Sequence, residues 1–281
     1  MKNNERALFI IDLDGTLWEG NVIEKTVYKM YDEGLFNDYL DIKKDELVNI
    51  LLEIYFHRRK VISEEILGKD SFREVVYRTF SKYTDENTAN YLANKYFDVF
   101  NKVKYEITLK DGSKEFLMSI KNYGKLILWT DGHYINTIEL LKNNLGDLYG
   151  NLFEEEIYPE KLYTVGFSDP FKPNLKIVEM LIRKYKPKKT IVVGDHPYYD
   201  GIMSKYINGK SIILADDSET IIDLLNGRFS VSPMAQLHYD EIVELYMNGK
   251  IVLAKNFDDA LKIISKLTSD DDAKEKVVYN R

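Results

Sequence analysis

Short apolar runs that stop at polar residues are the feature that most constrains how this chain can fold. Residues 7–11 read Ala-Leu-Phe-Ile-Ile and lead directly into Asp12. Similar runs occupy residues 126–129, 191–193 and 212–214, and Gly, Asp or Thr lies close to each. Strands that are apolar throughout and separated by helical patterns are typical of a parallel sheet with helices on both faces. The sequence therefore predicts an α/β fold with a Rossmann-like parallel sheet core.

Residues 19–108 have a different pattern. Apolar residues recur there at helical spacing, for example around Leu47 and Leu51, and no convincing strand is present. The aromatic stripes of this region are interpreted as core. We therefore expect a helical domain over 19–108, inserted into a sheet domain formed by 1–18 and 109–267. The acidic end of the chain, 268–281, is expected to be a flexible tail.

Two similar strand–helix patterns follow later in the chain. They begin at residues 209–214 and 249–254, and a helix is expected between them near 234–247. Residues 162–167 are also interpreted as a strand, followed by a loop and then a helix that begins after Pro173.

Composition excludes several classes of protein. With 39 basic and 46 acidic residues the formal charge is −7, which gives no indication of nucleic-acid binding. The absence of cysteine excludes disulfides, thiol nucleophiles and cysteine-ligated zinc. No apolar stretch is long enough to cross a membrane or to form a signal-peptide core. We expect a soluble, cytoplasmic protein without a membrane or nucleic-acid partner.

Asp12 and Asp14 lie two residues apart, directly after the first predicted strand, and Gly15 permits a tight turn. Ligands of open parallel sheets bind beyond the carboxyl ends of the strands. Two carboxylates there are unfavourable unless a cation joins them. An ordinary Asp-Gly turn is the alternative. A calcium loop fits poorly, because Leu17 and Ile23 stand where it needs Gly and Glu.

Three further signals follow the first in order along the chain. They are Thr130-Asp131-Gly132, Lys172, and the pair Asp195 and Asp200. Taken singly, Thr130 could be a helix cap and Lys172 a solvated loop residue. Taken together, they supply carboxylates for a hard cation, and a hydroxyl and an ammonium for phosphate oxygens.

These four motifs, with Asp12-Leu13-Asp14-Gly15-Thr16 as the first, resemble those of the haloacid dehalogenase superfamily, and residues 19–108 match the position of its cap domain. The resemblance implies that Asp12 is a nucleophile that forms an aspartyl-phosphate, and that Asp14 is the acid and base. It implies Mg²⁺ bound by Asp12, the Asp14 backbone carbonyl and Asp195, with Asp200 in support. Phosphoryl oxygens would contact Thr130, Asp131, Gly132 and Lys172. Asp131 departs from the family, which often has Asn there, so its backbone N–H is expected to matter more than its side chain.

Four other residues could contact the substrate. His133 and His196 adjoin the motifs, and Arg58 and Arg59 belong to a basic run in the helical domain. Bystander histidines and a solvated helix face are the alternatives.

The resemblance predicts a Mg²⁺-dependent phosphatase that acts on a small phosphorylated metabolite. Asp14 favours chemistry at phosphorus, since dehalogenases of the superfamily lack this second carboxylate. A phosphomutase shares every motif and remains an alternative. A non-catalytic phosphate-binding protein on the same fold is another alternative. Such a protein is expected to have lost at least one of the key residues, but this chain keeps all four, Asp12, Asp14, Lys172 and Asp195.

Overall fold

The structure, a computed structural model, divides the chain into two compact units. It describes residues 7–19, 22–36, 42–61, 71–132, 134–167, 169–216, 218–230 and 232–269. Unit 1 takes its described residues from 1–18, 109–227 and 238–281, and unit 2 takes its described residues from 19–108 and 228–237.

Unit 1 contains a six-stranded parallel sheet with the strand order β3-β2-β1-β4-β5-β6. The strands are β1 Ala7–Ile11, β2 Gly124–Trp129, β3 Phe153–Ile157, β4 Thr190–Gly194, β5 Gly209–Leu214 and β6 Ile251–Ala254. Ile10 of β1 pairs with Ile127 on one side and with Val192 on the other. The central position of β1 explains its uninterrupted apolar sequence, because both its faces and both its edges are covered. The predicted fold class is confirmed.

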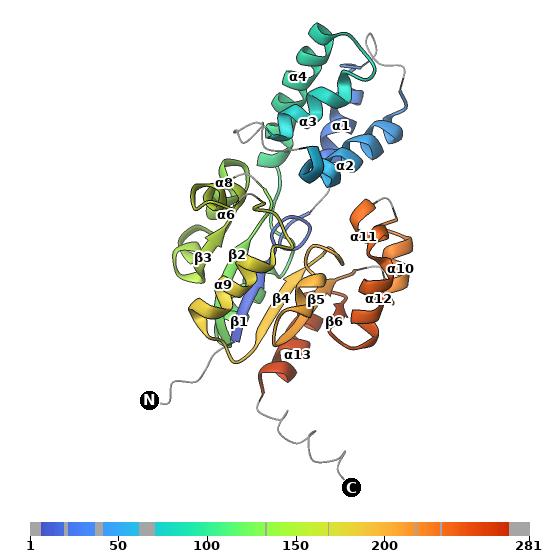
Figure 1. Ribbon diagram of the computed structural model, residues 1–281. Helices are drawn as coiled ribbons and strands as arrows, with labels where there is room; N and C mark the ends of the chain where they lie inside the picture. The colour runs from blue at the N-terminus through green and yellow to red at the C-terminus, as the bar shows by residue number, and fades with distance from the viewer. Residues whose placement is uncertain are drawn as a thin grey trace. The chain divides into compact units, whose positions relative to one another are not determined.

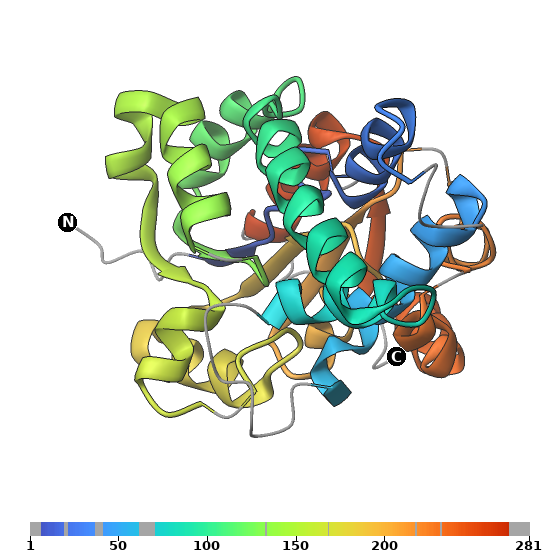
Figure 2. The ribbon, with the colours of Figure 1, turned by 90° about the horizontal axis from the view of Figure 1, so that it is seen from above.

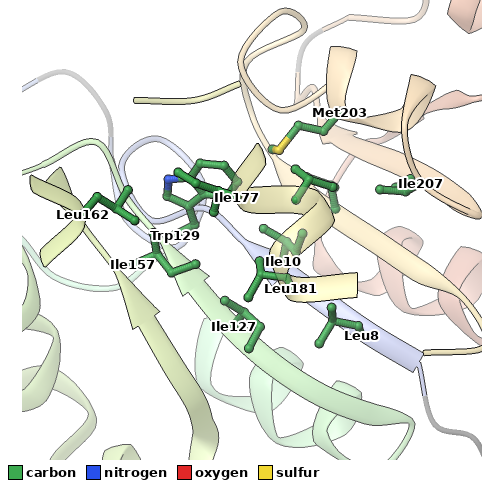
Figure 3. Packing of buried hydrophobic residues seen from close by; sticks show 12 residues of the cluster. Leu8, Ile10, Ile127, Trp129, Ile157, Leu162, Ile177, Leu181, Met203 and Ile207 are labelled. Atoms are coloured by element: carbon green, nitrogen blue, oxygen red, sulfur yellow. The ribbon is translucent and has the colours of Figure 1, made fainter. Parts of the chain in front are cut away.

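Helices cover both faces of this sheet. They are α5 Ser113–Lys121, α6 Tyr134–Leu145, α7 Tyr149–Leu152, α8 Pro159–Thr164, α9 Leu175–Tyr185, α10 Ile221–Asn226, α12 Tyr239–Met247 and α13 Phe257–Thr268, with 3₁₀ turns at Gly146–Leu148 and Ile202–Lys205. Figures 1 and 2 show α9 on one face and α13 on the other. Alternate residues of each strand therefore meet different helices: Leu8 and Ile10 pack in the cluster that includes Ile177 and Leu181 of α9 (Figure 3).

Helices joined by turns make up the described residues of unit 2. Its helices are α1 Val22–Asp32, α2 Lys44–Val61, α3 Ser71–Phe80, α4 Glu86–Tyr105 and α11 Pro233–Leu237. Leu92, Tyr96 and Val103 recur at helical spacing along α4 and are buried, in agreement with their interpretation as core. The Asp85 side chain accepts hydrogen bonds from the backbone N–H groups of Asn87 and Thr88 and so fixes the start of α4.

Three features differ from the sequence analysis. The interpretation of 162–167 as a strand is wrong, because α8 begins at Pro159 and runs to Thr164. Strand β3, which reads Phe-Glu-Glu-Glu-Ile, was not expected, since its charges hide the apolar pattern of an edge strand. Residues 228–237, expected in the sheet domain, group with unit 2, where α11 contacts α2.

Two further points concern the described residues. None of their helices is both long and apolar enough to cross a membrane. The expected tail begins where α13 ends, at Thr268, and from residue 270 onward it lies outside the part of the chain that the structure describes.

Candidate active site

The parallel register brings the polar residues after β1, β2 and β4 to one edge of the sheet. Ile11, the last residue of β1, pairs with Leu128 and Val193, so the residues that follow each strand are close neighbours. The Asp12 N–H donates to the Val193 carbonyl at 2.9 Å and continues the ladder one residue further. Asp12, Thr130 and Asp195 therefore emerge side by side at the carboxyl ends of the strands.

Lys172 joins two buried carboxylates. Its Nζ donates to Asp12 Oδ1 and lies 2.7 Å from Asp200 Oδ1. The other Asp12 oxygen, Oδ2, accepts a hydrogen bond from the Thr16 hydroxyl at 2.8 Å. That hydroxyl is also 3.5 Å from Asp195 Oδ1. All five of these side chains are buried, and among them one ammonium faces three carboxylates.

Two glycines leave room for these carboxylates. A Cβ on Gly15 would lie 2.3 Å from Asp195 Oδ2, and Gly15 has a φ of +85°. A Cβ on Gly194 would lie 2.1 Å from Asp200 Cγ. Any larger residue at either position would displace a carboxylate, so the glycines before Asp195 and after Asp14 are steric requirements of the site.

The Asp14 side chain turns to different partners. Its Oδ1 accepts a hydrogen bond from Trp18 Nε1 at 2.8 Å, and its Oδ2 accepts one from Thr130 Oγ1 at 3.2 Å. The Thr130 hydroxyl in turn accepts from the Gly132 N–H at 2.9 Å. Asp12 and Asp14 are therefore two residues apart in sequence but have separate hydrogen-bond partners.

The Asp131 side chain makes a contact that was not expected from the sequence. Its Oδ1 accepts a hydrogen bond from the Lys172 backbone N–H at 3.0 Å. The side chain thus fixes the loop that carries Lys172. The expected contact of the Asp131 backbone N–H with phosphate stays a prediction.

Burial controls the charges of the site. Desolvation raises the pKa of Asp12 to about 7, although the Lys172 ammonium opposes the shift and the Asp200 carboxylate adds to it. Desolvation also raises the pKa of Asp200, again against the effect of Lys172. Burial alone would lower the pKa of Lys172, but the carboxylates of Asp12 and Asp200 reverse this and raise it above its ordinary value.

The buried carboxylates fit a hard cation. Asp12, Asp195 and Asp200 each offer an oxygen, and these atoms lie within 4.8 Å of one another. Carboxylate oxygens are the preferred protein ligands of Mg²⁺. The Asp14 side chain, predicted to act away from the metal, is not part of this cluster, whereas Asp200, predicted only as support, is.

The other candidate residues are placed as follows. His196 is buried, and its Nδ1 accepts hydrogen bonds from the backbone N–H groups of Tyr198 and Tyr199, so this nitrogen shapes the loop between Asp195 and Asp200. His133 lies outside the described residues. Arg58 and Arg59 belong to α2, but their side chains are also outside what the structure describes, and their contact with a substrate stays a prediction.

Three contributors were missed by sequence reasoning. Thr16 and Trp18 bond the two motif carboxylates, and Lys110 Nζ donates to the Gly15 carbonyl at 2.8 Å. Thr16 could have been found from its place within the first motif. No sequence signal connects Lys110 with Gly15, which is 95 residues away.

The chain belongs to the haloacid dehalogenase-like hydrolases, because the family model matches residues 7–208. No match was found among curated proteins. A 2-haloacid dehalogenase from Pseudomonas syringae pv. Tomato DC3000 is a structural neighbour with 17% identity and a TM-score of 0.51, over 93% of this chain and 99% of that one.

Two further structural neighbours are named as enzymes that act on phosphate esters. A predicted phosphoglycolate phosphatase from Haemophilus somnus 129PT has 16% identity and a TM-score of 0.56, and a candidate beta-phosphoglucomutase from Thermotoga maritima has 13% identity and a TM-score of 0.55. Each alignment covers 93% of this chain and 99% of the neighbour. At these identities the likeness shows the fold, and the reaction must be argued from the site.

Proposed function

We propose that this hydrolase is a Mg²⁺-dependent phosphatase that acts on a small phosphorylated metabolite. The observation that carries the proposal is the separation of Asp12 from Asp14. Asp12 is buried against Lys172 and the other carboxylates, whereas Asp14 is bonded to Trp18 and Thr130. Two carboxylates in different surroundings suit two different roles, a nucleophile and a proton carrier.

In the first step an Asp12 oxygen attacks phosphorus and the bond from phosphorus to the ester oxygen breaks. Asp14 gives its proton to that leaving oxygen. In the second step water attacks the phosphorus of the aspartyl-phosphate and loses a proton to Asp14. The bond between Asp12 and phosphorus breaks, which releases inorganic phosphate, restores the Asp12 carboxylate and leaves Asp14 protonated as at the start.

The remaining residues would stabilise charge. Lys172 and the Thr130 hydroxyl are donors suited to phosphoryl oxygens, whose charge is the main obstacle to attack by a carboxylate. Asp12, Asp195 and Asp200 would bind Mg²⁺, together with the Asp14 backbone carbonyl. The ion would neutralise the charge on carboxylates and phosphoryl oxygens.

The test is turnover on a panel of phosphorylated metabolites with Mg²⁺ and with chelator. We expect hydrolysis that requires Mg²⁺ and that Asp195→Asn weakens by lowering the affinity for the ion. Full turnover in chelator would contradict the metal assignment. Absence of hydrolysis across the panel would contradict the phosphatase.

A phosphomutase is the second candidate, because the same residues serve when a sugar hydroxyl replaces water in the second step. One of the structural neighbours is named as a candidate beta-phosphoglucomutase, so the same fold is compatible with this alternative. Incubation with a sugar monophosphate and its bisphosphate separates the two: isomerised sugar phosphate indicates a mutase, and inorganic phosphate indicates a phosphatase.

A further inference from the structure

Trp18 closes the turn that carries the two motif carboxylates. It is the last residue of unit 1 before the chain enters unit 2, and its side chain is fully buried. Its backbone forms isolated bridges with Asp14 and with Leu109, the first residue after the chain returns to unit 1. The Trp18 N–H donates to the Leu13 carbonyl at 3.4 Å. The backbone of Trp18 is thus fixed on both sides.

The indole of Trp18 places a single donor on Asp14. Nε1 is 2.8 Å from Asp14 Oδ1, and the Thr130 hydroxyl is 3.2 Å from Oδ2. Each oxygen of the carboxylate therefore has its own donor, and the two donors come from different loops. A buried indole has few rotamers and cannot follow a mobile carboxylate, so this pair fixes the plane of the Asp14 side chain.

We propose that Trp18 is a positioning residue that orients Asp14 for proton transfer. This inference rests on the proposed function, in which Asp14 protonates the leaving oxygen. An indole N–H can donate but cannot accept. Oδ1 therefore remains an acceptor, and the proton that Asp14 moves is carried by Oδ2, beside the Thr130 hydroxyl, which can donate or accept.

The chain contains a matched control. Trp129 is the second of its two tryptophans and is also fully buried, in the core cluster of Figure 3. Among the described residues its Nε1 has no hydrogen-bond partner. Trp18→Phe removes an indole N–H that bonds Asp14, whereas Trp129→Phe removes one that bonds nothing.

The kinetic test compares both variants on an alkyl phosphate and an aryl phosphate. An alkyl leaving group needs protonation and an aryl group needs little, so Trp18→Phe should lower kcat about 10-fold on the alkyl ester and much less on the aryl ester. KM should stay within about twofold, because the Trp18 side chain is fully buried and offers no exposed surface to a substrate. Trp129→Phe should leave the alkyl-to-aryl ratio at the wild-type value. An unchanged ratio in Trp18→Phe would overturn the inference.

A second measurement does not depend on turnover. The two indole N–H groups give two ¹⁵N-resolved NMR signals, which the two Phe variants assign. Asp14→Ala should move the Trp18 signal and leave that of Trp129 in place. If Trp18→Phe does not fold, a tryptophan isostere with sulfur in place of the N–H at position 18 keeps the shape and removes the donor.

The outcomes separate the two claims. An unmoved Trp18 signal overturns the bond to Asp14 and leaves the phosphatase standing. A wild-type protein that hydrolyses no phosphate ester overturns the proposed function and with it the positioning role, even where the NMR shift confirms the bond.

Discussion

Lys172 and Asp200 form a buried ion pair, with 2.7 Å between Lys172 Nζ and Asp200 Oδ1. The same ammonium bonds Asp12, the candidate nucleophile. Lys172 thus has a structural role even without bound phosphate, because its ammonium offsets the unfavourable free energy of burying several carboxylates together. This double role leads to the first prediction.

Lys172→Met should lower both turnover and stability. Loss of a donor to the reacting phosphoryl group typically costs about 10²–10³-fold in kcat. Removal of one partner from a buried ion pair typically costs about 3–5 kcal/mol of unfolding free energy. Lys176→Met, at an exposed position on α9, removes the same charge and is the control. Steady-state rates and urea unfolding measure the two effects, and similar behaviour of the two variants would contradict both roles.

Mg²⁺ binding should release protons near neutral pH. The ordinary pKa of Asp12 is 3.8, and burial raises it to about 7 in the metal-free protein. Between these values the folded protein holds a proton that the unfolded chain has lost, so the Asp12 contribution lowers the stability of the metal-free protein as pH rises from about 4 to about 7.

The ion competes with that proton, so its affinity should rise with pH through this range. Calorimetric titrations of Mg²⁺ in buffers of different ionisation enthalpy would count the protons released. An affinity that is flat from pH 5 to 8 would contradict a protonated Asp12.

The variants Asp12→Asn and Asp14→Asn should lose different steps of the reaction. Asp12→Asn should abolish turnover and covalent labelling, because the nucleophile is gone. Asp14→Asn should leave attack possible but remove proton transfer, which typically contributes about 10²–10⁴-fold per step. Its loss should be smaller on an aryl phosphate than on an alkyl phosphate. Equal fractional losses on the two esters, with phosphoenzyme formation rate-limiting for both, would remove Asp14 from the acid role.

Gly194→Ala should displace Asp200. Its Cβ would lie 2.1 Å from Asp200 Cγ, so the carboxylate must move away from Lys172. Overpacking of this kind typically costs about 1–3 kcal/mol, and Mg²⁺ affinity should fall as well. Gly150→Ala is the control, because a Cβ there meets nothing within 4 Å. Thermal unfolding with and without Mg²⁺ measures the effect, and equal melting temperatures for the two variants would contradict it.

Central strands could be predicted because burial on both faces leaves a continuous apolar run, as in β1. The edge strand β3 could not be predicted, because its glutamates interrupt the apolar pattern. Glu154 and Glu155 form ion pairs with lysines from other elements, and these partners are not evident from the sequence. Residues 162–167 were misassigned because their apolar and aromatic residues suit a buried strand as well as they suit α8, in which Leu162 reaches the same core.

The sequence alone determined the fold class and the order of the four motifs, because both depend on local pattern and on the rule that parallel strands end at one edge. Only the tertiary structure decided which carboxylates lie together. Asp200 joins Asp12 and Asp195 in one cluster. The Asp14 side chain instead accepts hydrogen bonds from Trp18 and Thr130. It also decided that residues 228–237 group with unit 2. These outcomes depend on side-chain direction and long-range packing, which the spacing of residues along a chain does not specify.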